Sequence, residues 1–290
     1  MGNKHDEKSY KHKDLLEYFS EYSNEKPIWN YDFVYKNNMN DLNLMELRKK
    51  YNLDLKSGKS DDFNGQLRIM RWVHEALLNK ETEPYSGNLT ALDILNKAFN
   101  KRKCFNCITH AVVLAQCLLS MGYCARYISC MPLDALPFDN HVLTEVYSST
   151  HQKWIVLDAT INAYFTDSCN KILSLIEIRD CLIREEKLSF NYFDRFSGSG
   201  ALKSDYSVNY SEDRYINTMI RNFFVLQYRQ INDSSYYNEE EVYYRLIPQK
   251  YLQSNIEKIL YECNKKTEYR YTDNAAFIYS DPIQKEEKKG

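Results

Sequence analysis

Glycine and proline are scarce in this 290-residue chain, at 8 and 6 residues, and the formal net charge is only −2. So small a charge provides no field that would attract nucleic acid or an acidic membrane surface. The apolar run at residues 111–122 is interrupted by Gln116 and is too short to cross a bilayer. The N-terminal residues lack the apolar core of a secretion signal. We therefore expect a soluble, cytoplasmic protein that binds neither nucleic acid nor membrane.

The chain is long enough for one large domain or two modest ones. The apolar spacing predicts helices over residues 40–52, 61–79, 88–100 and 108–121, and strands over 123–131, 141–148 and 153–158. Farther along, it predicts helices over 173–183 and 211–232 and short strands over 241–247 and 275–280. The Gly/Ser-rich stretch at 197–207 predicts a loop, and no stretch has the composition of a clear linker. We divide the chain into a polar segment (1–25), a helical region (26–100), a central region (101–168) and a mixed α/β region (169–290) that packs on it.

The chain contains eight cysteines, and without a secretion signal we expect their thiols to be reduced. Cys104 and Cys107 form a CxxC pair, which is found in thioredoxin-like proteins and in zinc sites. A thioredoxin-like fold needs an apolar strand directly before the pair, whereas the preceding stretch KAFNKRK is basic and helical. A zinc site needs two more ligands at matching spacing, and Cys124 and Cys130 do not form a second CxxC. We therefore predict no metal site.

Cys107 lies at the start of the predicted helix 108–121, directly after Asn106. Unpaired backbone N–H groups and the positive end of the helix dipole stabilise a thiolate at such a position. The same N–H groups can bind an anion beside the sulfur, which makes half of an oxyanion hole. Considered alone, Cys107 fits a buried structural thiol better, because cysteine is among the most buried residue types. Its role depends on whether a base lies nearby.

His141 is the best candidate for that base among the six histidines, because it opens a predicted strand. If the following hairpin turns between residues 150 and 151, Asp158 becomes a diagonal neighbour of His141 on one sheet face, about 6–8 Å away. A carboxylate at the end of an apolar strand is costly to bury without a partner. The imidazole N–H would supply one, and Asp158 would orient the ring. A register slip by one residue would separate the two side chains.

The spacing Cys107-x3-Ala111-x10-Gly122-x2-Ala125-Arg126, followed by His141-x12-Trp154-x3-Asp158, resembles the transglutaminase-like superfamily. That group includes transglutaminases, peptide N-glycanases, bacterial proteases and many uncharacterised bacterial proteins. The resemblance covers residues 100–160, about a fifth of the chain. It implies that the cysteine heads a helix and that the histidine and aspartate lie on neighbouring strands. It therefore assigns Cys107, His141 and Asp158 the roles of nucleophile, base and orienting carboxylate.

Two positions depart from the family pattern without removing a catalytic group. Phe105 stands where a glycine is frequent. The family often has Asp-Pro-Thr at the aspartate, whereas this chain has Asp158-Ala159-Thr160, so the substrate class stays open. Some relatives use an upstream tryptophan as an oxyanion donor. Trp72 is a candidate for that role, although its predicted helix favours core packing. Asn106 and Trp154 are further candidates for the oxyanion site or the cleft wall.

We expect an α+β fold with a transglutaminase-like or papain-like core, in which a central helix packs on an antiparallel sheet between helical elaborations. The predicted function is cysteine-dependent acyl transfer from a carboxamide or peptide bond of a protein or peptide substrate, without metal or organic cofactor. The alternative is a non-catalytic protein- or peptide-binding module that retains the fold. The sequence distinguishes neither hydrolysis from amine transfer nor one oligomeric state from another.

Overall fold

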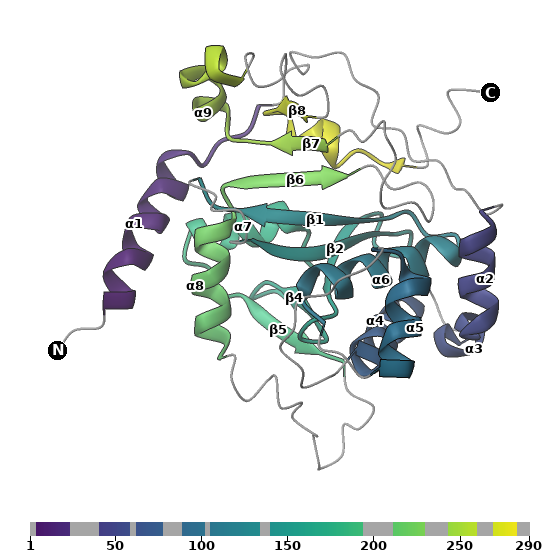
Figure 1. The fold of residues 1–290 in the computed structure, drawn as a ribbon. Coiled ribbons are helices and arrows are strands. Elements are labelled where there is room, and N and C mark those ends of the chain that lie inside the picture. The colour runs from purple at the N-terminus through teal and green to yellow at the C-terminus, as the bar shows by residue number, and fades with distance from the viewer. Residues whose placement is uncertain are drawn as a thin grey trace.

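A computed structural model describes residues 4–23, 41–58, 62–77, 89–101, 105–133, 140–193, 211–229, 243–259 and 269–282. The Gly/Ser-rich stretch 197–207 and Cys104 of the CxxC pair lie outside these ranges. Helices and one mixed sheet make up the described part, so the fold is α+β (Figure 1). Within the described ranges, no helix has both the length and the apolar character needed to cross a membrane.

The described part of the chain contains ten helices and eight strands with assigned bounds. The helices are α1 (Lys4–Tyr18), α2 (Leu42–Lys50), α3 (Leu53–Ser57), α4 (Asp62–Leu77), α5 (Ala91–Lys101), α6 (Cys107–Ser120), α7 (Leu175–Ile183), α8 (Glu212–Asn222) and α9 (Gln249–Ser254), followed by the short α11 (Ala275–Ile278). The strands are β1 (Ala125–Met131), β2 (His141–Ser148), β3 (Lys153–Asp158), β4 (Ala163–Thr166), β5 (Ser189–Tyr192), β6 (Val225–Arg229), β7 (Tyr243–Leu246) and β8 (Tyr269–Thr272).

The eight strands form one sheet in the order β5-β4-β3-β2-β1-β6-β7-β8. All neighbours pair antiparallel except β7 and β8, which are parallel. The sheet therefore joins strands from the central region to strands from the C-terminal region. The division of the chain into four regions stays a prediction.

Helices cover both faces of the sheet. Alternate residues of the central strands point to opposite faces, so each of these strands packs against helices on both sides. Val142 and Val146 of β2 pack in one apolar cluster with α4, α5 and α6. Leu143 and Tyr147 of the same strand pack in a second cluster, which contains residues of α1, α7 and α8. Figure 1 shows α2 to α6 gathered at the right of the view and α1 and α8 at the left. Such burial on both faces stabilises the strands that carry the candidate site.

For two elements, the predicted type of secondary structure is wrong over part or all of the range. The predicted helix 211–232 ends at Asn222, and residues 225–229 form β6. β6 pairs with β1 and β7, and its Leu226 and Tyr228 are buried. The periodicity of this apolar run fits a helix or a strand, so pairing with neighbouring strands determines its conformation. The predicted strand 275–280 is instead the helix α11, because the Asn274 side chain accepts the backbone N–H of Phe277 and caps a helical turn.

Three strands have no counterpart in the sequence prediction. β4, β5 and β8 are each four residues long, which is too short for a clear alternating pattern. The predicted helix 40–52 also ends earlier than expected, because Asn52 adopts a left-handed conformation with φ of 50° and separates α2 from α3.

Candidate active site

Cys107 is the first residue of α6, and Asn106 is its N-cap. The Asn106 side chain accepts the backbone N–H of Thr109 at 3.2 Å, and its backbone carbonyl accepts the Thr109 hydroxyl at 2.7 Å. These bonds fix the first turn of the helix. Cys107 is half-buried, and the helix that follows it is buried from Thr109 to Ser120. The sulfur therefore lies at the positive end of a firmly packed helix.

His141 and Asp158 meet across the hairpin of β2 and β3. Tyr147 pairs with Trp154 in this hairpin, which is the register that the sequence predicts. His141 Nε2 lies 2.9 Å from Asp158 Oδ2. The Asp158 side chain is 1% exposed and that of His141 is 14% exposed, so the pair is shielded from solvent. Nδ1 of His141 remains as the ring nitrogen for a further partner.

The Cys107 thiol contacts His141, and the backbone N–H of Val142 donates to the same sulfur. Burial favours the neutral thiol, but the hydrogen bond and charge of His141, together with the Val142 N–H, lower the pKa of Cys107 below its usual value. The structure thus connects three side chains that the sequence separates by up to 51 residues, Cys107, His141 and Asp158.

The charges in this group favour an ion pair between sulfur and imidazole. Burial opposes the charged imidazole, but the charge and hydrogen bond of Asp158 and the contact with Cys107 raise the pKa of His141 to about 10. Burial likewise opposes ionisation of Asp158, but the charge and hydrogen bond of His141, together with the hydrogen bonds from Tyr215 and Thr160, lower the pKa of that carboxyl. A thiolate beside an imidazolium is the reactive form of a cysteine nucleophile.

Residues 49–159, which contain all three side chains, match the profile of the transglutaminase-like superfamily. This segment, somewhat more than a third of the chain, is therefore transglutaminase-like. Among curated proteins, none matches the chain significantly. A crystal structure of a candidate cysteine protease from Cytophaga hutchinsonii is 20% identical over 49% of this chain, with a TM-score of 0.32. The chain spans about half of that protein, 46%, so this likeness assigns no activity here.

The Asp158 carboxylate accepts two further hydrogen bonds from residues outside the matched segment. The Tyr215 hydroxyl, on α8, donates to Asp158 Oδ2 at 2.7 Å, and the backbone N–H of Thr160 donates to Asp158 Oδ1 at 2.8 Å. The sequence prediction missed Tyr215. On α8, Tyr215 and Met219 lie one turn apart and form part of a buried apolar face. Tyr215 is 57 positions from Asp158 in the sequence, so no local pattern indicates their contact.

Two further histidines lie close to the transglutaminase-like triad and are neutral. His74 on α4 contacts the Ala159 carbonyl through Nδ1 at 2.8 Å, and His110 on α6 contacts the Asn106 carbonyl through Nδ1 at 2.9 Å. Burial lowers the pKa of both, that of His110 to about 4. His141 is therefore the imidazole of this group that carries the proton near neutral pH.

The two tryptophans proposed for the cleft have well-defined partners elsewhere. The Trp154 ring lies 4.1 Å from the Arg126 guanidinium, and its Nε1 donates to the Ser280 carbonyl at 3.2 Å. The Trp72 ring lies 5.6 Å from the Tyr51 ring and 5.2 Å from the Lys56 ammonium. A role for either residue, or for Asn106, in oxyanion binding stays a prediction.

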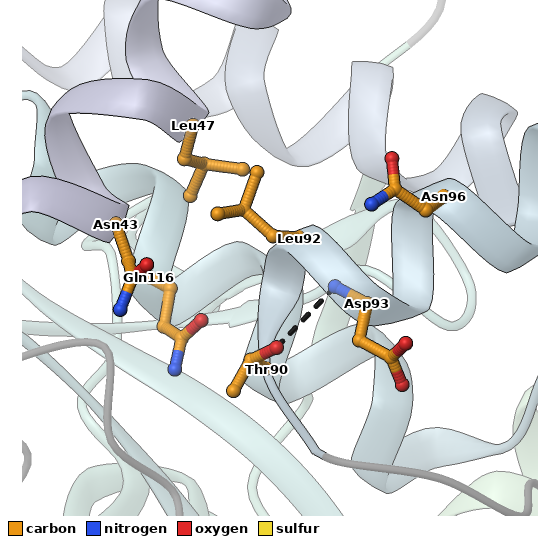
Figure 2. Close-up of a pocket in the computed structure, with 7 residues that line it drawn as sticks. All are labelled: Asn43, Leu47, Thr90, Leu92, Asp93, Asn96 and Gln116. Atoms are coloured by element: carbon orange, nitrogen blue, oxygen red, sulfur yellow. Dashed lines mark hydrogen bonds between the residues drawn. The ribbon is translucent and has the colours of Figure 1, made fainter.

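A cavity of about 240 Å³ lies apart from the triad, between α2, α5 and α6. Figure 2 shows its lining, which consists of Asn43, Leu47, Thr90, Leu92, Asp93, Asn96 and Gln116. Gln116 is nine residues beyond Cys107 on the same helix, which corresponds to about 14 Å along its axis. The cavity is therefore not the space beside the sulfur. Among the described residues, no cluster of three or more His, Cys, Asp or Glu side chains is placed to hold a metal ion.

Proposed function

We propose that the protein is a cysteine-dependent acyl-transfer enzyme that acts on a carboxamide or peptide bond of a protein or peptide. The observation that carries the proposal is the thiol of Cys107 held against His141, whose ring is in turn bonded to Asp158. A structural thiol buried among aliphatic groups would have a raised pKa, as Cys117 has here. Cys107 shows the opposite shift.

In the proposed reaction, the Cys107 thiolate attacks the carbonyl carbon and the carbonyl π electrons move to oxygen. The backbone N–H of Cys107, at the start of α6, is placed to stabilise the oxyanion. The intermediate collapses as the C–N bond breaks, and the departing amine takes the proton from the His141 imidazolium. Neutral His141 then removes a proton from water or from an acceptor amine, which attacks the thioester and releases Cys107. Asp158 holds the ring throughout.

Site-specific alkylation tests this proposal without a known substrate. The protein is treated with iodoacetamide near neutral pH, and mass spectrometry measures the alkylation rate of each cysteine peptide. We expect Cys107 to react faster than Cys169, an exposed thiol that serves as an internal control. His141→Ala should reduce the rate at Cys107 and leave that at Cys169 unchanged. Equal rates at both cysteines in the unaltered protein would contradict an activated nucleophile.

The reaction itself is tested with glutamine-containing peptides and a protein digest. Mass spectrometry would detect hydrolysis as ¹⁸O incorporation from labelled water, and amine transfer as addition of a supplied primary amine. Cys107→Ala should abolish either product. If Cys107 reacts rapidly with iodoacetamide but neither product forms on any peptide, the acyl-transfer proposal fails while the activated thiol stands, which would favour the binding-module alternative.

A further inference from the structure

Tyr215 reaches the candidate active site from a part of the chain that the superfamily match does not include. It lies on α8, 57 residues after Asp158 and beyond the matched segment 49–159. We propose that Tyr215 is a positioning residue that locks the Asp158 carboxylate in the orientation His141 requires. This inference rests on the proposed function, because it concerns the same triad.

The position of the Tyr215 phenol is fixed by its packing. The side chain is buried at 4% exposure. Its ring lies 5.7 Å from Phe165 in a stacked arrangement and 5.3 Å from Phe190 in an edge-on arrangement. The same ring meets the His141 imidazole edge-on at 5.5 Å. Tyr215 thus touches both the base and the carboxylate that orients it, and its neighbours leave the ring little freedom to turn.

The hydrogen bonds of Asp158 show what the hydroxyl contributes. Oδ1 accepts the Thr160 backbone N–H, while Oδ2 accepts from both Tyr215 and His141. The Thr160 bond restrains only Oδ1 and does not hold the oxygen that His141 contacts. The phenol adds a second fixed point and stabilises the negative charge at the oxygen that His141 contacts. Without it, we expect the imidazolium to be held less firmly beside Cys107.

Other ionisable groups near this carboxylate lie on five elements, two helices and three strands. The charge of Asp158 affects the pKa of six of these groups, which are His74 on α4, Cys107 and His110 on α6, Cys130 on β1, His141 on β2 and Tyr192 on β5. None of them donates to Asp158 Oδ2 among the described hydrogen bonds except His141. The test therefore has to separate loss of the hydroxyl from a general disturbance of this environment.

Tyr215→Phe removes only the hydroxyl and keeps the ring contacts. The matched control is Tyr192→Phe, because the Tyr192 hydroxyl donates to Glu212 on the same helix α8 without touching Asp158. The readout is the pH at which alkylation of Cys107 is half-maximal in rate. We expect Tyr215→Phe to move that midpoint upward, because a less firmly held imidazolium stabilises the thiolate less, and to slow alkylation at pH 6 about tenfold. Tyr192→Phe should leave both unchanged.

A merely structural role predicts a different result. If Tyr215 only anchors α8, Tyr215→Phe lowers the melting temperature as Tyr192→Phe does, but leaves the Cys107 midpoint where it is. That result overturns the positioning role and leaves the proposed function intact. If the unaltered protein shows an ordinary thiol midpoint, both proposals fall.

A second variant covers the case in which Tyr215→Phe does not fold. Replacing Tyr215 with 3-fluorotyrosine keeps the shape of the ring and makes the phenol a stronger hydrogen-bond donor. We expect the Cys107 midpoint to move downward in this protein. A midpoint unchanged from that of the unaltered chain would contradict the inference.

Discussion

At the scale of single residues, opposing effects set the pKa of the Cys107 thiol. Burial favours the thiol, while His141 and the Val142 N–H favour the thiolate, and the second set prevails. The same competition occurs at His141, where the Asp158 carboxylate outweighs the cost of burying a charged ring. Reactivity at this site therefore depends on buried neighbours more than on the intrinsic chemistry of a thiol.

Asp158→Asn should lower the pKa of His141 from about 10 toward its ordinary value of 6.5, because the amide carries no charge to stabilise the imidazolium. A ¹H–¹⁵N NMR titration of the histidine rings measures the shift. The control is Asp62→Asn, since Asp62 binds the turn at Ser149 and Thr150, at the opposite end of the β2–β3 hairpin. An unchanged His141 titration in Asp158→Asn would show that the carboxylate does not govern the ring.

The same shift has a consequence for stability. The pKa of His141 is raised in the folded state, so its ion pair contributes stability that is fully present below about pH 6.5 and is lost as the pH rises through about 10. Urea unfolding at pH 6 and pH 10.5 should therefore show a smaller difference in unfolding free energy between the unaltered protein and Asp158→Asn at the higher pH. An equal difference at both pH values would contradict this assignment of charge.

At the scale of secondary structure, the cap of helix α6 holds Cys107 in place. Asn106→Ala removes the acceptor of the Thr109 N–H and should reduce the unfolding free energy by about 1 kcal/mol. It should also slow alkylation of Cys107, because a frayed first turn no longer holds the sulfur against His141. Thermal unfolding and site-specific alkylation measure the two effects.

The control for this cap is Asp41→Ala. Asp41 caps α2 by accepting the N–H groups of Asn43 and Leu44 at 2.9 Å, so its loss should reduce stability to a similar degree. Alkylation of Cys107 should not change in Asp41→Ala. Similar slowing in both variants would indicate a global loss of structure, which would count against a local role for Asn106.

The sequence predicts the elements of the site better than those at the edges of the sheet. β2 and β3 have the predicted bounds and register, because strongly apolar alternation and one short turn determine both. β6 is the informative failure. The sequence predicts residues 225–229 as a continuation of α8. They form a strand because they pair with the edge of β1. The contact of Tyr215 with Asp158 was inaccessible for the same reason, because it depends on how distant elements pack.

At the scale of the whole molecule, a buried ion pair ties the layers together. Arg126 on β1 donates to Glu145 on β2 at 2.7 Å and to the Ile278 carbonyl of α11 at 2.9 Å. Glu145 in turn accepts the backbone N–H of Leu175 at the start of α7 at 3.2 Å. The guanidinium also lies 4.5 Å from the Tyr228 ring of β6. One pair of charges thus connects elements from both halves of the chain.

Removing one member of this pair leaves the other charge buried without a partner. We expect Arg126→Met to reduce the unfolding free energy by about 3–5 kcal/mol, measured by urea denaturation. The double variant Arg126→Met with Glu145→Leu should be more stable than Arg126→Met alone, because no isolated charge remains. A double variant less stable than both single ones would mean that the two charges do not act as a pair.

The strand order also has a consequence for how the protein is made. β1 is bordered on one side by β2, which follows directly, and on the other by β6, which lies almost a hundred residues later. A growing chain on the ribosome therefore presents Cys107, His141 and Asp158 long before α8 and β6 have been translated. Until then the phenol of Tyr215 is missing and β1 has an open edge. On the proposals made above, acyl transfer supported by Tyr215 would begin only after α8 has emerged.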